Sequence, residues 1–224
     1  MALILNLETA TTNCSVSIAK DGEVIAIKEH NTPDYSHSEQ LHVFIGDVLR
    51  EAYLDRHGLD AVAVSKGPGS YTGLRIGVSA AKGLCFALDL PLVSVPTLES
   101  MAGQVRGSDV DFIIPLLDAR RMEVYSTVFD KDLLEVRTTK AEIIEGNSFQ
   151  EYLSKGKVLL LGSGAEKCIG AIEHENVMFN TEIVPSSREM AGLSFAKFKE
   201  NDFEDVAYFE PYYLKDFVLQ GKKK

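Results

Sequence analysis

The stretch SKGPGSYTGLRIGVSAAKGL, residues 65–84, places a bend rich in glycine and proline directly before a helical pattern. The residues at its start, 60–66, are apolar enough to form a buried strand, so the bend joins a strand to a helix. Such a bend can direct backbone N–H groups toward an anion, or it can be a tight turn that lets the helix pack closely. Its spacing is neither a Walker A loop nor G-x-G-x-x-G, because Lys66 precedes the glycines, and this favours the structural turn.

Strand and helix patterns alternate through the first half of the chain. Five apolar stretches have the composition of strands: residues 2–8, 14–20, 23–30, 60–66 and 91–95. Helical spacing recurs in three stretches: residues 36–58, 72–88 and 97–105. Asp21-Gly22 predicts a two-residue hairpin, and Ser36 with Glu39 predicts a capping box at the start of a helix that Gly58 ends. Three strands, a helix, a strand, a helix and a strand are typical of one lobe of the actin-like fold.

The second half repeats this order less cleanly. Strand patterns occupy residues 112–119, 122–130, 133–139 and 158–162. Helical patterns occupy residues 147–156, 163–172 and 187–200. We therefore predict an α/β protein with the two-lobed actin-like ATPase fold, which is ribonuclease H-like and shared by sugar kinases and Hsp70. Its N-terminal lobe is expected at residues 1–104 and a smaller, degenerate lobe at 105–224, with the aromatic-rich segment 205–217 packed along both.

Composition limits the size, the location and the partners of the protein. Its 224 residues, 45% of them hydrophobic, suffice for one large domain or two modest ones. A net charge of −10 lacks the basic footprint of a protein that holds a duplex or tRNA by itself. Cys14, Cys85 and Cys168 lie far apart, which predicts buried thiols rather than disulfides or a zinc site. We expect a cytoplasmic protein, because no signal peptide or membrane-spanning run is visible.

Small residues recur along the helix that follows the bend. Gly73, Gly77 and Ala81 lie four residues apart and share one helix face. Glycine inside a helix costs about 1 kcal/mol relative to alanine, so close packing is expected there, either within the chain or against another subunit. The helical pattern before it carries a wide apolar arc. We predict a helix–helix interface with a partner, formed by Leu41, Phe44, Ile45, Val48, Leu49, Gly73, Gly77, Ala81 and Leu84.

Six segments resemble, in order and over nearly the whole chain, the bacterial TsaB family. They are LNLETATTNCSVSI, HSEQL, SKGPGSYTGLRIGVSAAKGL, SVPTLESMA, LLDARRMEVY and EPYYLKDF. That family comprises glycoprotease-like, or peptidase M22-like, proteins of tRNA threonylcarbamoyladenosine biosynthesis. The resemblance implies a scaffold that pairs, through its first two helices, with the catalytic paralogue TsaD or with itself. It also implies that a small ATPase, TsaE, joins the pair and that tRNA is contacted only indirectly.

The resemblance further implies that this chain lacks the chemistry of its catalytic relative. That relative holds a metal with a His-x-x-x-His pair, where this chain has Thr97 and Met101, so we expect no metal site and no catalytic residue. Among five histidines, His37 and His42 are predicted to be surface or capping residues. Serines beside glycines match no nucleophile elbow. A glycoprotease-type metallopeptidase is therefore the least favoured alternative.

A second alternative is an ATPase or phosphotransferase of the actin-like superfamily. Such an enzyme has an acid at the end of its first strand and two phosphate loops, and here the turn at residues 118–125 has no glycine. The residues that remain as candidate nucleotide contacts are Glu8, Thr9, Gly67, Gly69, Gly162 and Gly164. We expect no stably bound cofactor. The sequence leaves open a nucleotide at the subunit junction, a homodimer, and tRNA contacts by Arg120, Arg121 or the final lysines.

Overall fold

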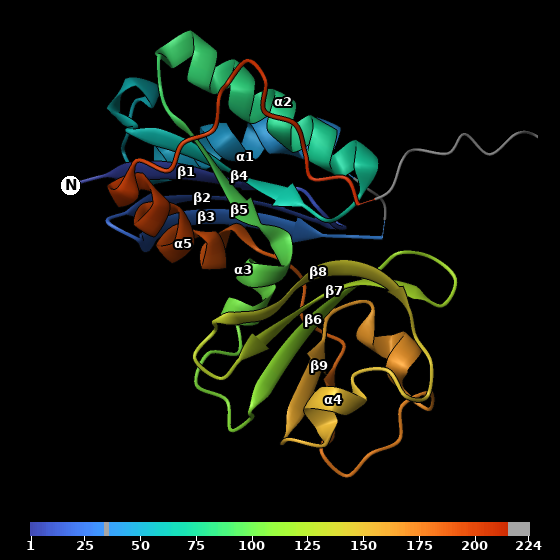
Figure 1. The fold of residues 1–224 in the computed structure, drawn as a ribbon. Coiled ribbons are helices and arrows are strands. Elements are labelled where there is room, and N and C mark those ends of the chain that lie inside the picture. The colour runs from blue at the N-terminus through green and yellow to red at the C-terminus, as the bar shows by residue number, and fades with distance from the viewer. Residues whose placement is uncertain (34–35, 215–224) are drawn as a thin grey trace, which may run out of the picture.

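Two mixed sheets of five strands each form the centres of two lobes in the computed structural model, which describes residues 1–33 and 36–214 (Figure 1). The first sheet contains β1 (Leu3–Glu8), β2 (Asn13–Lys20), β3 (Glu23–Asn31), β4 (Ala61–Gly67) and β5 (Leu92–Pro96). The second contains β6 (Phe112–Asp118), β7 (Glu123–Asp130), β8 (Glu135–Ile143), β9 (Val158–Leu161) and β10 (Val177–Asn180). Only β10 has no counterpart among the predicted strands.

The two sheets share one topology. The first has the strand order β3-β2-β1-β4-β5 and the second, read from β8, has the order β8-β7-β6-β9-β10. In each, the first three strands pair antiparallel, whereas the last two run parallel to the first strand. The hairpin at Asp21-Gly22 is confirmed, since both residues have positive φ, as a type I′ turn requires. This duplicated topology confirms the two-lobed actin-like fold.

The helices differ greatly in length between the lobes. They are α1 (His37–Glu51), α2 (Tyr71–Leu88), α3 (Thr97–Gly103), α4 (Gln150–Leu153) and α5 (Ser187–Glu200), with short 3-10 turns η1 (Arg56–Gly58) and η2 (Ala165–Cys168). In the second lobe, α4 and η2 have four residues each, where α1 and α2 of the first lobe have 15 and 18. The predicted helices at 147–156 and 163–172 are therefore too long, and the second lobe is reduced, as expected.

The last helix of each lobe packs against the sheet of the other lobe. Helix α3 follows β5 and places Leu98 and Met101 in a core with residues of the second sheet. Helix α5 follows β10 but packs against β1, β2 and β5 of the first sheet, where Met190 meets Ile4 and Val93 (Figure 1). The division at residue 104 therefore fails for α5, which the sequence order assigns to the second lobe. This exchange fastens the two lobes together.

Helix α1 ends earlier than Gly58 because its own backbone closes it. Tyr53 adopts φ +55°, and the N–H groups of Tyr53 and Leu54 bond to the carbonyls of Arg50 and Leu49. These two bonds form a Schellman motif, and Leu54 packs against the core beneath α1. At the other end, the predicted capping box is wrong, since the Ser36 side chain makes no capping hydrogen bond.

The described chain ends in an extended segment, residues 202–214, that we call the terminal strap. It crosses α2 on the first lobe and ends near the start of that helix (Figure 1). Lys82 of α2 donates to the carbonyls of Ala207 and Phe209, and the Tyr212 N–H donates to the Lys66 carbonyl. The aromatic segment thus lies mainly along the first lobe as far as residue 214. Its last residues, 215–217, and the terminal lysines lie outside the described residues.

Candidate functional site

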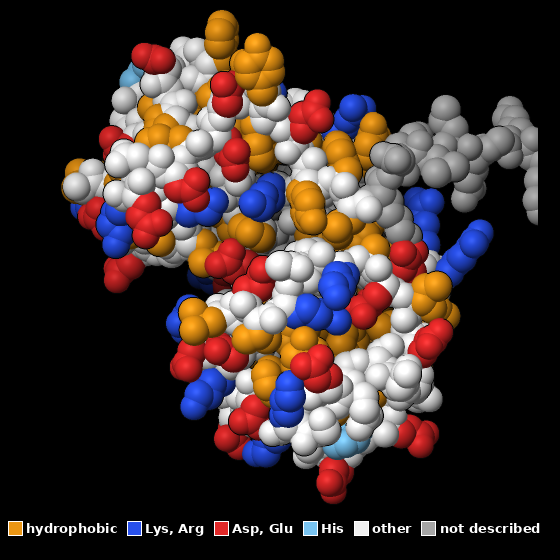
Figure 2. Space-filling model, in the orientation of Figure 1, with side chains coloured by type: hydrophobic (Ala, Val, Ile, Leu, Met, Phe, Trp, Pro, Cys, Tyr) orange, Lys and Arg blue, Asp and Glu red, His pale blue; other side chains and the backbone are white. Residues whose placement is uncertain are grey.

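A cleft of about 710 Å³ separates the lobes at the carboxyl ends of their central strands. Most of its lining comes from residues 10–12, 68–72, 117–120, 183–185 and 212–214. In the space-filling view the lobes are separated by a constriction at which acidic and basic side chains both gather (Figure 2). Open α/β sheets bind ligands at the carboxyl ends of their strands, so a nucleotide bound by this fold would be expected in this cleft.

The predicted nucleotide contacts Glu8 and Thr9 are buried and do not line this cleft. Glu8 Oε1 accepts hydrogen bonds from the Ala10 N–H at 2.6 Å and from Ser65 Oγ at 2.8 Å. Burial is the largest effect on this carboxyl group and raises its pKa to about 7. Thr9 Oγ1 donates to the Gly73 carbonyl at 2.8 Å. Both side chains serve contacts within the first lobe.

The glycines of the opening stretch seat helix α2 on the turn between β1 and β2. A Cβ atom on Gly73 would lie 2.2 Å from the Thr9 carbonyl oxygen, and one on Gly77 would lie 2.3 Å from Thr9 Oγ1. A Cβ atom on Gly69 would lie 2.5 Å from the Ala10 carbonyl oxygen, which also accepts a hydrogen bond from the Ser70 N–H. The prediction that Gly73 and Gly77 face another subunit is therefore wrong, because the chain itself occupies that space.

The remaining candidate glycines are also packed against protein atoms. Gly67 and Gly162 have φ of +104° and +93°, a conformation that favours glycine. A Cβ atom on Gly162 would lie 2.4 Å from Met101 Cε, and one on Gly164 would lie 2.9 Å from Leu116 Cβ. Backbone conformation and close packing thus account for these glycines without a ligand.

The turn between β6 and β7 contributes opposite charges to the cleft. Arg120 and Arg121 have φ of +72° and +52°, which non-glycine residues rarely adopt. Asp118 Oδ1 accepts hydrogen bonds from the Arg120 N–H and, at 2.7 Å, from Lys167 Nζ. Asp118 and Arg120 both line the cleft, so a phosphate group placed here would meet a carboxylate as well as a guanidinium group. Neither the Asp118–Lys167 pair nor this turn conformation is visible from sequence spacing.

A second concavity, which we call the groove, lies between α1 and α2. Ten residues line it: Ser38, His42, Tyr71, Thr72, Arg75, Ile76, Ser79, Ala80, Gly83 and Leu84. Its volume is about 750 Å³, and Tyr71 and Thr72 line the cleft as well. The groove therefore opens on the outer surface of the first lobe and meets the cleft at the start of α2.

The predicted interface residues divide between the core and this outer surface. Four of them are buried in the core of the first lobe and are not available to a partner: Leu41, Ile45, Val48 and Ala81. Three are partly exposed: Phe44, Leu49 and Leu84. The exposed residues of α2 include Arg75, Ser79, Gly83 and Phe86, which are spaced by four, four and three. Sequence spacing thus selected mainly the inward faces of these two helices, which pack within the chain itself.

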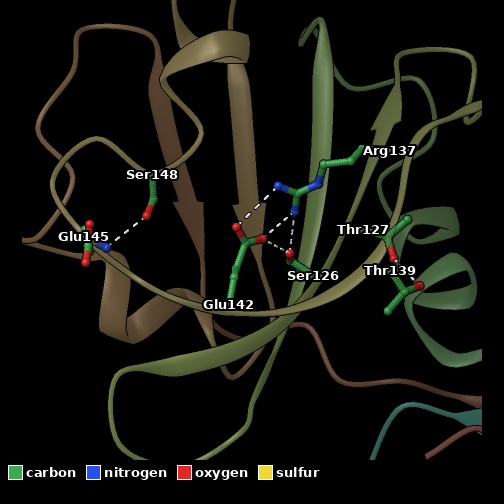
Figure 3. Close-up of polar contacts among 7 residues, drawn as sticks. All are labelled: Ser126, Thr127, Arg137, Thr139, Glu142, Glu145 and Ser148. Atoms are coloured by element: carbon green, nitrogen blue, oxygen red, sulfur yellow. Dashed lines mark hydrogen bonds and ion pairs between the residues drawn. The ribbon is translucent and has the colours of Figure 1, made fainter. Parts of the chain in front are cut away.

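Polar contacts also hold the edge of the second sheet together (Figure 3). Arg137 of β8 donates to Ser126 of β7 and to Glu142, each at 2.5 Å, and its guanidinium lies 5.3 Å from the centre of the Phe149 ring. Thr127 and Thr139 join the same two strands through their hydroxyl groups. None of these residues lines the cleft or the groove, so the network stabilises the sheet edge.

Comparisons with known proteins give one consistent answer. The family model for TsaD, tRNA N6-adenosine threonylcarbamoyltransferase, matches residues 32–216. The tRNA threonylcarbamoyladenosine biosynthesis protein TsaB of Escherichia coli (strain K12) is 30% identical, over 98% of this chain and 97% of its own. The protein of the same name from Bacillus subtilis (strain 168) is also 30% identical, over 98% of this chain and 96% of its own. The chain belongs to the TsaB family.

The fold of this TsaB family member matches a solved structure closely. YeaZ from Pseudomonas aeruginosa superposes with a TM-score of 0.84, at 23% identity, over 96% of this chain and 100% of that one. A protein from the same organism with similarity to peptidase YeaZ superposes with a TM-score of 0.86. At this level of identity the likeness concerns the fold alone.

Several residues that the family resemblance singles out are buried here. Thr97 and Met101, which the resemblance places opposite the histidine pair of the catalytic relative, are fully buried, and Met101 packs in the core beneath α3. His42 is exposed, as predicted, but His37 is neither a surface nor a capping residue. It is buried, and its Nε2 donates to the Thr11 carbonyl at 2.6 Å. Within residues 1–33 and 36–214, no group of three His, Cys, Asp or Glu side chains could hold a metal ion.

Two further sequence expectations concern thiols and membranes. The three cysteines are free and buried, as predicted. Burial is the main cause that raises the pKa of the Cys14 and Cys85 thiols to about 11, so both groups are protonated thiols near neutral pH. No helix in the described part of the chain combines the length and apolar composition needed to cross a bilayer.

Proposed function

We propose that this chain acts in tRNA threonylcarbamoyladenosine biosynthesis as a non-catalytic subunit that binds a TsaD-type transferase through the groove between α1 and α2. The role in this pathway follows from the TsaB relatives, which match nearly the whole chain. The observation that carries the docking site is the outer face of α2. Ser79 and Gly83 leave that face without bulk, and Phe86 beside them is 86% exposed.

A large exposed aromatic side chain next to a depression fits an interface between proteins. No atom lies within 4 Å of the Cβ position of Gly83, so a partner helix can approach this part of α2 closely. Gly46 of α1 has the same open space. We also propose that the chain binds a TsaE-type ATPase and a second copy of itself. Its net charge of −10 supports indirect rather than direct contact with tRNA.

The non-catalytic part of the proposal is supported by how the candidate residues are used. Glu8 and Thr9 bond to neighbours inside the first lobe, and Thr97 and Met101 are buried. Asp118 lines the cleft, where its carboxylate would repel a phosphate group. These placements favour a binding subunit over an ATPase. Without the transferase, the purified chain is expected to produce no threonylcarbamoyladenosine on tRNA, and with it the modification should proceed.

Replacing Gly83 by leucine is expected to lower the affinity for the transferase of the same organism at least tenfold. The added side chain would enter the space that a partner helix needs, and overpacking of tight contacts typically costs about 1–3 kcal/mol. Isothermal titration calorimetry with the two purified proteins measures the change, and the same variant should slow formation of the modified nucleoside.

Gly192→Leu is the matched control. Gly192 is an exposed helical glycine on α5, and its Cβ position is equally free of neighbours, but it lies outside the groove. It is expected to bind the transferase as the unmodified chain does. Equal affinities of the Gly83 and Gly192 variants would refute docking at the groove.

A further inference from the structure

We infer that Tyr213 of the terminal strap holds Arg75 at the end of the groove, where Arg75 receives a carboxylate of the docked transferase. This inference rests on the proposed function and deepens it. It adds two things: a residue outside the two helices that shapes the docking surface, and the chemistry of the partner group that meets Arg75.

The positive charge in the groove indicates which chemical group of the transferase binds there. Among the ten residues that line the groove, Arg75 carries the only permanent charge, and no lining residue is acidic. The chain as a whole has a net charge of −10, so an exposed cation in an acid-free groove stands out from its surroundings. A guanidinium group binds a carboxylate in a planar, two-point arrangement. Nucleic-acid phosphates are usually bound by several cations together, and this groove offers one.

A stack of side chains fixes the position of Arg75. Its guanidinium lies 4.7 Å from the centre of the Tyr71 ring, one helical turn earlier on α2. The Tyr71 ring centre is 5.0 Å from that of Tyr213, with the two planes tilted by 37°. The guanidinium also lies close enough to the Tyr213 hydroxyl to oppose the rise in pKa that burial causes there. Arg75 is therefore an exposed residue whose charge is held by aromatic neighbours.

Contacts outside the groove anchor the strap that carries Tyr213. The Tyr212 N–H donates to the Lys66 carbonyl at 2.7 Å, immediately before Tyr213. Farther back, Lys82 Nζ donates to the carbonyls of Ala207 and Phe209 at 3.1 and 2.9 Å. Val206 and Phe209 pack against the core of the first lobe. Because the strap is fixed by these contacts, Tyr213 can limit the orientations of Arg75 before a partner arrives, and such preorganisation increases affinity.

The test compares single and double variants by calorimetry with the purified transferase, at low and at high salt. Arg75→Gln is expected to lower the affinity about tenfold at low salt and to remove most of its salt dependence. Tyr213→Ala should cause a similar loss although Arg75 is present, whereas Tyr213→Phe, which keeps the ring, should bind normally. In the double variant the losses should not add, because both act through the same group.

Tyr208→Ala is the matched control, because Tyr208 lies on the same strap but is 84% exposed. It should bind as the unmodified chain does. Normal affinity of Tyr213→Ala, or fully additive losses in the double variant, would overturn the inference while leaving the proposed function intact. Weakened self-association with unchanged transferase binding would also overturn it, since the carboxylate would then belong to a second copy. If the unmodified chain does not bind the transferase, the proposed function itself fails.

Discussion

An alanine in place of Gly73 is expected to lower the free energy of unfolding by about 2 kcal/mol. Its methyl group would lie 2.2 Å from the Thr9 carbonyl oxygen, a backbone atom. The turn cannot withdraw freely, because Thr9 Oγ1 bonds to the Gly73 carbonyl and the Ser70 N–H bonds to the Ala10 carbonyl. Overpacking typically costs about 1–3 kcal/mol, and a contact this short with a backbone oxygen lies at the upper end of that range. The helix preference of alanine offsets about 1 kcal/mol, which leaves about 2 kcal/mol. Unfolding in urea, followed by circular dichroism, measures the change.

The same substitution at Gly83 provides the control on the same helix. Gly83 is exposed, and nothing lies within 4 Å of its Cβ position. Alanine there is expected to raise the free energy of unfolding by about 0.5–1 kcal/mol, because glycine loses more backbone entropy on folding. The two variants should therefore change stability in opposite directions. If both stabilised the protein, the contact between α2 and the turn at Thr9 could not be the reason for glycine at position 73.

The small residues of α2 show what sequence spacing can and cannot predict about packing. Residues 73, 77 and 81 lie on one helix face, and this periodicity correctly predicts that something approaches closely. The approaching residue is Thr9, which is 64 positions away from Gly73 and comes near only when β1 and β4 pair. Periodicity within a helix contains no information about that pairing. The choice between an internal contact and a partner was therefore beyond the sequence pattern.

The packing of α5 against the first lobe was also beyond the sequence pattern, because it depends on contacts between distant segments. Hydrophobic spacing correctly predicts a helix near residues 187–200, and the strand order correctly indicates two lobes. However, α5 buries Met190 against Ile4 and Val93 of the other lobe. Polar contacts reinforce this docking, since Ser194 Oγ donates to Asn6 and Ser187 bonds to Ser15. These partners are more than 170 residues apart, and serines carry no hydrophobic pattern that could reveal them.

For charged residues, too, the sequence gives the residue type but not its environment. The sequence shows Glu8 to be an acid at the end of the first strand, the position at which an ATPase of this fold is expected to have one. Its burial depends on Ser65, from the neighbouring strand, and on the turn at Ala10, neither of which the sequence brings together. In the sequence Arg75 is one of 23 Lys and Arg residues, and nothing there sets it apart. Its position in the groove becomes visible only in the structure. Residue type is readable from sequence, whereas environment depends on contacts between distant segments.

Replacing Glu8 by glutamine is expected to remove a pH-dependent loss of stability. In the folded chain burial raises the pKa of Glu8 from its ordinary value of 4.5 to about 7. Between these two values the folded state keeps a proton that the unfolded state has released, so the stability of the unmodified chain falls as pH rises. Because one pKa unit corresponds to about 1.4 kcal/mol, the full loss is about 3 kcal/mol above pH 7 and is absent below pH 4.5.

The measurement is the difference in free energy of unfolding between Glu8→Gln and the unmodified chain, across that pH range. Glutamine can still accept the hydrogen bonds from the Ala10 N–H and Ser65 Oγ, yet it never ionises. The difference should therefore grow by up to about 3 kcal/mol as pH rises from 4.5 to 8. In Ser65→Ala, a hydrogen bond that lowers the pKa of Glu8 is lost, so the fall in stability should still begin near pH 4.5 but should extend to higher pH. A difference that stays constant with pH would mean that Glu8 is ionised in the folded chain, with water or a cation reaching its carboxylate.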